Sequence, residues 1–334
     1  MPRVFASHAV PASPRRAREA GADYGQTAEP SWRTVDWTAL LRRHPFGGSE
    51  INYIDLIPED PAAHQRTPVV FVHGLGGQWQ NWIENIPRSA LEQRTVALDL
   101  PGFGMSPMPD GEISISMYSE VVEAACRDLS LGPVAVVGNS MGGFIGAELA
   151  IRHPERVERL MLVSAAGITT ADVYRGPVSA LARAGTMLVG YTAARHRELA
   201  RRPVSRHLAL ALVARHPSRI APDLAYEAML KGAGKPGFED ALGACLDFDF
   251  RDRLPEIGCP TLIVWGEDDA ILPAGDADEF ERLIPDARKV LLRDTGHVPM
   301  LERPSTFNDI LAGFLSERGS AETHEPAPGA TQVA

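Results

Sequence analysis

A serine in a glycine-rich turn is the residue of this sequence best suited to act as a nucleophile. Ser140 is the central residue of Gly138-Asn-Ser-Met-Gly142, which follows the pattern G-x-S-x-G. The apolar run 134–137 before it is typical of a short buried strand, and the run 144–151 after it is typical of a helix. A serine on such a turn is held at a strained backbone position, and the glycines let strand and helix pass closely. The pattern therefore predicts a nucleophile elbow.

A serine hydroxyl is a weak nucleophile unless a neighbouring base takes its proton, and that base is usually a histidine. Of the ten histidines, His297 lies in the loop Arg293-Asp-Thr-Gly-His-Val-Pro-Met300, directly after a predicted strand. His73 also ends a predicted strand, but its glycine-rich surroundings suit backbone donation better than base catalysis. We therefore expect His297 to be the base.

The imidazole in turn needs a carboxylate that fixes its tautomer. The stretch Trp265-Gly-Glu-Asp-Asp-Ala-Ile-Leu-Pro273 also follows a predicted strand and supplies Glu267, Asp268 and Asp269. The residues alone do not distinguish Asp268 from Asp269.

Acyl transfer to a serine also needs N–H donors for the developing oxyanion, and loss of one donor typically costs about 3 kcal/mol. The N–H of Met141, the residue after the serine, is one candidate. The second is the N–H of Leu75 or its neighbour Gly76, where Gly74 and Gly76 would let the backbone approach a substrate. Three aromatic residues are candidates for the substrate pocket, although such residues more often belong to the core: Trp79, Trp82 and Phe144.

The elements that position these residues alternate between strand and helix. Apolar runs predict strands at 51–57, 68–73, 94–99, 134–137, 157–164, 260–265 and 287–292. Helical spacing predicts helices at 116–129, 144–151, 274–283 and 304–316. This alternation predicts a mostly parallel sheet covered on both faces, whose chemistry lies beyond the carboxyl ends of the strands. The first strand alternates apolar and polar residues and is expected to be antiparallel.

The alternation is interrupted between about 169 and 250, where helical runs at 178–189, 206–214, 224–230 and 238–246 predict a helical cap. Two interpretations of its arginines are open: a solvated helix face, or a basic rim that faces an anionic substrate or interface. These arginines are Arg175, Arg183, Arg195, Arg197, Arg201, Arg202, Arg206, Arg215 and Arg219.

The composition of the chain limits which partners the protein can have and how its domains are organised. The chain has 334 residues and a net charge of -10, which argues against nucleic acid as a partner. No apolar run is long enough to span a membrane, and the three scattered cysteines favour a reduced, cytoplasmic setting. We expect a disordered arm at 1–30, core segments at 31–168 and 251–318 around a cap at 169–250, and a disordered tail at 319–334.

Five stretches together resemble the α/β-hydrolase superfamily, and the resemblance extends over residues 50 to 317. They are His73-Gly-Leu-Gly76, Asp99-Leu-Pro-Gly-Phe-Gly-Met-Ser106, Gly138-Asn-Ser-Met-Gly-Gly143, Gly266-Glu-Asp-Asp269 with Pro273, and Gly296-His297. The resemblance implies an α/β-hydrolase fold with a helical cap after the sixth strand. It also implies a catalytic triad of Ser140, Asp269 and His297, because the family's acid is the fourth residue of the G-x-x-D stretch. Asp268 is the alternative acid.

The resemblance also narrows the activity. A serine at the elbow speaks against epoxide hydrolases and haloalkane dehalogenases, which use an aspartate. The elbow is similar to that of C–C bond hydrolases of aromatic degradation, which usually have a tryptophan after the histidine, where this chain has Val298. It is equally similar to esterases and monoacylglycerol lipases.

We expect a carboxylic ester hydrolase that acts on a small-molecule ester or acyl substrate through an acyl-enzyme. The alternatives are a C–C bond hydrolase of a vinylogous diketone, a cofactor-free perhydrolase and a non-catalytic ligand receptor. The mechanism implies no metal or organic cofactor.

Overall fold

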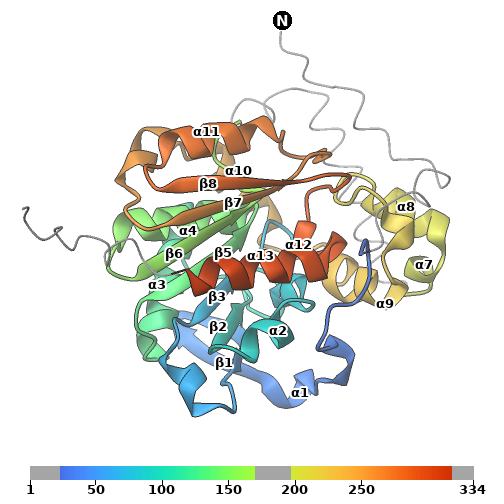
Figure 1. Ribbon diagram of the computed structural model, residues 1–334, viewed down its shortest axis with the longest axis horizontal. Helices are drawn as coiled ribbons and strands as arrows, with labels where there is room; N and C mark the ends of the chain where they lie inside the picture. The colour runs from blue at the N-terminus through green and yellow to red at the C-terminus, as the bar shows by residue number, and fades with distance from the viewer. Residues whose placement is uncertain (1–22, 170–196, 318–334) are drawn as a thin grey trace, which may run out of the picture.

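The computed structural model describes residues 23–169 and 197–317, and within them the strands form one eight-stranded sheet (Figure 1). The strands are β1 (Leu41–Phe46), β2 (Ser49–Leu56), β3 (Val69–Val72), β4 (Thr95–Leu98), β5 (Val134–Asn139), β6 (Val157–Val163), β7 (Thr261–Gly266) and β8 (Ala287–Leu292). Their order is β1-β2-β4-β3-β5-β6-β7-β8. β2 runs antiparallel to both β1 and β4, and the pairs from β4 to β8 are parallel. The predicted mostly parallel sheet is confirmed.

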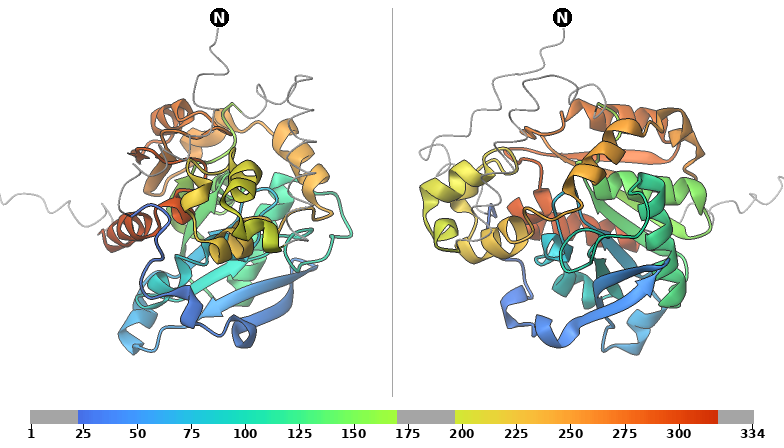
Figure 2. Two further views of the ribbon diagram at one scale, coloured as in Figure 1. Left: turned by 90° about the vertical axis from the view of Figure 1, so that its right-hand side faces the viewer. Right: turned by 180° about the vertical axis from the view of Figure 1, so that it is seen from behind.

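Helices cover both faces of the sheet because the side chains of each buried strand alternate between them. On β3, Val70 and Val72 belong to one apolar core, and Val69 and Phe71 belong to the other. The first core includes residues of α3, α4 and α11, and the second includes residues of α2 and α13, so these helices lie on opposite faces (Figure 2). Their bounds are α2 (Ile86–Ala90), α3 (Ile115–Asp128), α4 (Met141–Arg152), α11 (Gly275–Leu283) and α13 (Pro304–Ser316).

The sheet edge contains a strand that the sequence did not predict. β1 is mostly exposed and contains Arg42, Arg43 and Pro45, so it lacks the apolar run by which a strand is recognised. Charged residues and proline are tolerated there because an edge strand pairs on one side only. A short helix, α1 (Trp37–Leu40), precedes it.

Residues 23–30, which we expected to be part of a disordered arm, are ordered. Tyr24 is buried, with 2% of its surface exposed, and its hydroxyl donates to Glu302 Oε2 over 2.5 Å. The N–H of Ala28 and Nε1 of Trp32 donate to opposite oxygens of the buried Glu84, each over 2.9 Å. The composition of this segment gives no sign of these contacts, because its partners lie far away in the sequence.

The helical cap follows β6, as expected. Its described part comprises α7 (Arg197–Arg201), α8 (Pro203–Leu210), α9 (Pro222–Leu224), the π-helical turn η6 (Ala225–Leu230) and α10 (Phe238–Asp247). Figure 1 shows α7, α8 and α9 grouped at one end of the sheet. The helix predicted at 178–189 lies outside the described residues. Among the helices that the structure describes, none combines the length and apolarity that a membrane crossing requires.

Candidate active site

Ser140 connects β5 to α4 in a backbone conformation that is rare for residues with a side chain. Its φ is 55° and its ψ is -118°, and a positive φ at a non-glycine residue usually indicates strain that the surroundings maintain. Two hydrogen bonds to the end of β6 and the loop after it hold it: the Ser140 N–H donates to Val163 O over 2.9 Å, and Ser140 O accepts from the Ala166 N–H over 3.0 Å. This is the geometry expected of a nucleophile elbow.

The glycines around Ser140 have no room for a side chain. A Cβ at Gly138 would lie 2.1 Å from Gly142 O, and a Cβ at Gly142 would lie 2.1 Å from Val72 O and 2.7 Å from His73 O. The start of α4 therefore touches the backbone of β5 on one side and the end of β3 on the other. This contact brings the loop after β3 against Ser140.

The structure joins Asp269 to His297. Asp269 Oδ2 lies 2.8 Å from His297 Nδ1, and the Asp269 side chain is fully buried. Its other oxygen accepts from the N–H groups of Ile271 and Leu272 over 2.8 and 3.0 Å. With Nδ1 donating to the carboxylate, Nε2 is the nitrogen left to accept a proton.

Asp268, the alternative acid, points elsewhere. Its Oδ2 lies 3.5 Å from Nε of Arg215, a cap residue. The geometry therefore separates two neighbouring carboxylates that the residues alone left equivalent and of which the resemblance favoured Asp269, because the turn after β7 directs consecutive side chains to different sides.

Hydrogen bonds to the backbone of His297 hold this residue beside the elbow. The Asn139 side chain donates from Nδ2 to Val163 O over 3.0 Å and to His297 O over 3.2 Å. The N–H of His297 donates to Val213 O in the cap over 3.0 Å. Within residues 23–169 and 197–317, no hydrogen bond joins the Ser140 hydroxyl to the imidazole, and such bonds often tighten only when substrate is present.

The loop after β3, which contains the expected oxyanion donor Leu75, lies against Ser140. A Cβ at Gly74 would lie 3.1 Å from Ser140 Cβ. His73 shapes this loop: its Nδ1 donates to Gly74 O over 2.7 Å, and its Nε2 accepts from the Leu100 N–H over 3.0 Å. Burial lowers the pKa of His73 to about 4. A neutral imidazole with both nitrogens engaged is not available as a base.

The aromatic pocket candidates are buried in two different surroundings. Trp82 is fully buried and packs against Phe71 and Phe307, and Trp79 packs against Trp37 with ring centroids 5.0 Å apart. These contacts belong to the core on the α13 face. Contact with substrate stays a prediction for both tryptophans.

Phe144 lies on the other side of the sheet, at the start of α4. Its ring centroid is 4.4 Å from that of Phe250 and 5.5 Å from that of Phe248, and both of these follow the last helix of the cap. Phe144 thus packs where core and cap meet. That Phe144 lines the acyl pocket stays a prediction.

Two polar residues near His297 had no role in the sequence analysis. Asn139 lies inside the serine motif, at a position that the motif leaves free. Glu302 closes α12 (Pro299–Glu302), and its side chain is fully buried. The feature of the sequence that could have indicated a role for Glu302 is its place as a single carboxylate at the end of the apolar run Val298-Pro-Met-Leu.

Several cap arginines have structural partners. Arg206 is buried and donates to Pro217 O over 3.0 Å and to Ser218 O over 2.9 Å. Arg215 lies 3.5 Å from both Asp268 and Asp294. Arg175, Arg183 and Arg195 lie outside the described residues. Arg206 thus joins segments of the cap, and Arg215 lies between the cap and the loops after β7 and β8. The burial of Arg206 differs from the solvated helix face of the first interpretation, and contact of the cap arginines with an anionic substrate or interface stays a prediction.

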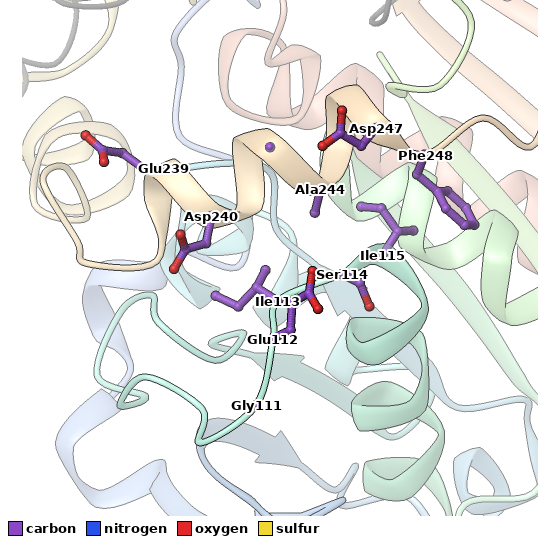
Figure 3. A pocket seen from close by; sticks show the side chains of 11 residues that line it. Gly111, Glu112, Ile113, Ser114, Ile115, Glu239, Asp240, Ala244, Asp247 and Phe248 are labelled. Carbon is purple, nitrogen blue, oxygen red and sulfur yellow. The ribbon is translucent and has the colours of Figure 1, made fainter.

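A cavity of about 540 Å³ lies between α10 and the loop that precedes α3 (Figure 3). Its lining includes four carboxylates, Glu112, Glu239, Asp240 and Asp247. Neither Ser140 nor His297 lines it, so it is not the candidate catalytic pocket. Among the described residues, no group of three or more histidine, cysteine or acidic side chains could hold a metal ion.

We expect Gly142→Ala to destabilise the fold, because its Cβ would collide with the backbone at the end of β3. The free energy of unfolding should fall by about 3 kcal/mol or more, measured by urea denaturation. Gly313→Ala is the matched control: Gly313 lies in α13 with open space at its Cβ position, and alanine there should stabilise by about 0.5–1 kcal/mol. Equal stability of the Gly142→Ala variant and the wild type would contradict the close approach.

His73 should make the protein acid-sensitive. Its folded pKa of about 4 lies below its ordinary value of 6.5, so the unfolded chain takes up the proton first on acidification. Its stabilising contribution is therefore full above pH 6.5 and is lost as the pH falls towards 4. Between pH 7 and 4.5 the wild type should lose about 2 kcal/mol more stability than His73→Gln.

Urea denaturation at the two pH values measures this difference. His44→Gln, a substitution at an exposed residue of β1, should retain the wild-type loss. An equal loss in wild type and His73→Gln would show that His73 is not the acid-sensitive group.

Known proteins share this architecture. Residues 67–304 match the family model described as alpha/beta hydrolase fold. The chain is 31% identical over 306 residues to the dihydrolipoyllysine-residue acetyltransferase component of the acetoin cleaving system of Pseudomonas putida, covering 89% of this chain and 72% of that protein.

Two further relatives are hydrolases by name. The 2-hydroxy-6-oxo-6-(2'-aminophenyl)hexa-2,4-dienoic acid hydrolase of Metapseudomonas resinovorans is 29% identical, with coverage of 81% of this chain and 89% of the relative. The pimeloyl-[acyl-carrier protein] methyl ester esterase of Aeromonas hydrophila is also 29% identical, with coverage of 75% and 96%. The match to the family model over most of the chain, together with the sheet order and the elbow, shows that this protein belongs to the α/β hydrolase fold family.

Proposed function

We propose that this protein is a serine hydrolase that cleaves carboxylic esters through an acyl-enzyme intermediate. The observation that carries the proposal is the 2.8 Å contact between the fully buried side chain of Asp269 and Nδ1 of His297, beside a serine at positive φ. A histidine oriented by a buried carboxylate is the arrangement that general-base activation of a serine requires.

In the proposed acylation step, Nε2 of His297 takes the hydroxyl proton of Ser140 as Oγ attacks the ester carbonyl carbon. The resulting oxyanion is stabilised by the N–H groups of Met141 and Leu75. Met141 is the first residue of α4, where the helix does not use the N–H and the helix dipole favours negative charge. Collapse of the intermediate breaks the ester C–O bond, and the imidazolium returns its proton to the leaving alkoxide.

Deacylation uses the same groups in the same order. His297 takes a proton from a water molecule, and the hydroxide attacks the carbonyl carbon of the acyl-serine. The tetrahedral intermediate then releases the carboxylic acid, and Ser140 regains its proton from the imidazolium. Asp269 stays ionised throughout and stabilises the positive charge on the ring.

A second candidate is hydrolysis of a C–C bond in a vinylogous diketone. It is supported by the relative from Metapseudomonas resinovorans, whose name specifies a hexadienoic acid hydrolase. The ester proposal has its own relative, the methyl ester esterase from Aeromonas hydrophila. Substrate choice is expected to depend on the cap and on the residues around His297, where the buried Val298 follows the histidine.

Substitution of the two neighbouring aspartates should separate catalytic from structural carboxylates. We expect Asp269→Asn to lower kcat by about 10⁴-fold, because the imidazole then adopts the wrong tautomer. Asp268→Asn should remain within about tenfold of the wild type, because its partner is Arg215. The measurement is steady-state turnover of a chromogenic short-chain ester, with Ser140→Ala as the background and Ser316→Ala, on the exposed end of α13, as the unaffected serine control.

A panel of substrates should decide between the two hydrolytic reactions. We expect kcat/KM for p-nitrophenyl esters of graded chain length to exceed that for a vinylogous diketone, and both to depend on Ser140. A higher kcat/KM for the diketone would favour C–C bond hydrolysis. Absence of turnover with every member, from a folded protein, would favour a non-catalytic receptor.

A further inference from the structure

Glu302 is a fully buried carboxylate whose partners include the residues on both sides of His297. The N–H of Gly296 donates to Oε1 and Oε2 over 2.9 and 3.0 Å, and the N–H of Val298 donates to Oε1 over 3.3 Å. Oε2 also accepts from the N–H of Arg215 in the cap over 2.8 Å and from the Tyr24 hydroxyl over 2.5 Å. One side chain thus connects the His297 loop, the cap and the N-terminal segment.

The partners of Glu302 match an ionised carboxylate. Each group named above is a donor, so a proton on either oxygen would face another hydrogen. The Tyr24 hydroxyl accepts from the His216 N–H over 2.6 Å, which leaves its own hydrogen for Glu302. Burial raises the pKa of Glu302 above its ordinary value, and the hydrogen bonds from Tyr24, Arg215 and Gly296 offset only part of this increase.

The same hydrogen bonds fix the backbone of the loop that carries the His297 imidazole. The N–H groups of Gly296 and Val298 point to Glu302, and the N–H between them, that of His297, donates to Val213 O over 3.0 Å. Three consecutive peptide groups therefore have set directions. The ring then has little freedom to move away from Asp269, to which Nδ1 is bound.

We propose that Glu302 is a positioning residue for His297: it holds the His297 loop so that the imidazole meets the Ser140 hydroxyl. Because Glu302 also binds the cap and Tyr24, this alignment depends on both of them. The inference rests on the proposed function insofar as His297 is the base. It assigns Glu302 no contact with substrate. Its contribution is geometric, and a displacement of about 1 Å at a catalytic group can cost about 10²-fold in rate.

Glu302→Gln tests this role with a nearly isosteric change. The amide places N–H hydrogens against backbone donors, so the loop must shift. We expect kcat for a chromogenic ester to fall about 10- to 100-fold while KM changes less than about threefold, because only the chemical step depends on the alignment. The Nδ1 proton of His297 should also change its downfield NMR resonance.

Glu84→Gln is the matched control. Glu84 is equally a buried carboxylate with donors from the N-terminal segment, the N–H of Ala28 and Nε1 of Trp32, but it has no bond to the His297 loop among the described residues. It should lose stability while kcat and the downfield resonance stay at the wild-type values. A fall in kcat no larger in Glu302→Gln than in Glu84→Gln, with an unchanged resonance, would overturn the proposal.

If the Glu302→Gln variant does not fold, the Tyr24→Phe variant provides the test, because this substitution removes a single hydrogen-bond donor from Glu302 Oε2. In the folded Tyr24→Phe variant, the Nδ1 proton resonance of His297 should shift and kcat should fall about threefold or more. An unchanged resonance together with an unchanged kcat would overturn the positioning role of Glu302. Failure of the proposed function is recognised separately: the wild type would then turn over no ester, while the resonance would still report whether Glu302 orients His297.

Discussion

The close passage of three backbone segments at the elbow is the constraint on which the rest of the site depends. The start of α4 touches the end of β3 and the end of β5 at distances that exclude a Cβ at Gly142 or Gly138. Because the backbones meet there, Ser140 is forced to turn sharply at positive φ, and the loop after β3 lies against it. The same backbone contact therefore positions both Ser140 and the proposed oxyanion donors.

Buried carboxylates organise the loops that the sheet cannot hold by itself. Asp99 accepts the N–H groups of Trp79 and Met105 over 2.7 and 2.8 Å and so joins the loops after β3 and β4. Asp269 and Glu302 do the same for the loops after β7 and β8. Each is costly to bury, and each is compensated by several directed donors. These hydrogen bonds restrict the conformations of the loops that carry the candidate site residues.

The cap contributes to the candidate site through its backbone. Val213 accepts the N–H of His297, and Arg215 donates its N–H to Glu302. Both residues follow α8, so a movement of this part of the cap would be transmitted to the loop that carries the imidazole.

Local patterns in the sequence determined the buried strands, the long helices and the serine motif, because burial on two sheet faces and sharp turns require particular residue types at short range. They also predicted Ser140 and His297 as site residues from their places after strands. The resemblance to a known family added Asp269 as the expected acid, and three features needed the tertiary structure: the edge strand β1, the ordered segment around Tyr24, and the contacts of Asp269 and Glu302 with the His297 loop. The contacts that order the Tyr24 segment, pair β1 at the sheet edge and direct the side chains of Asp269 and Glu302 come largely from distant parts of the chain, and spacing along a sequence does not record which distant groups meet.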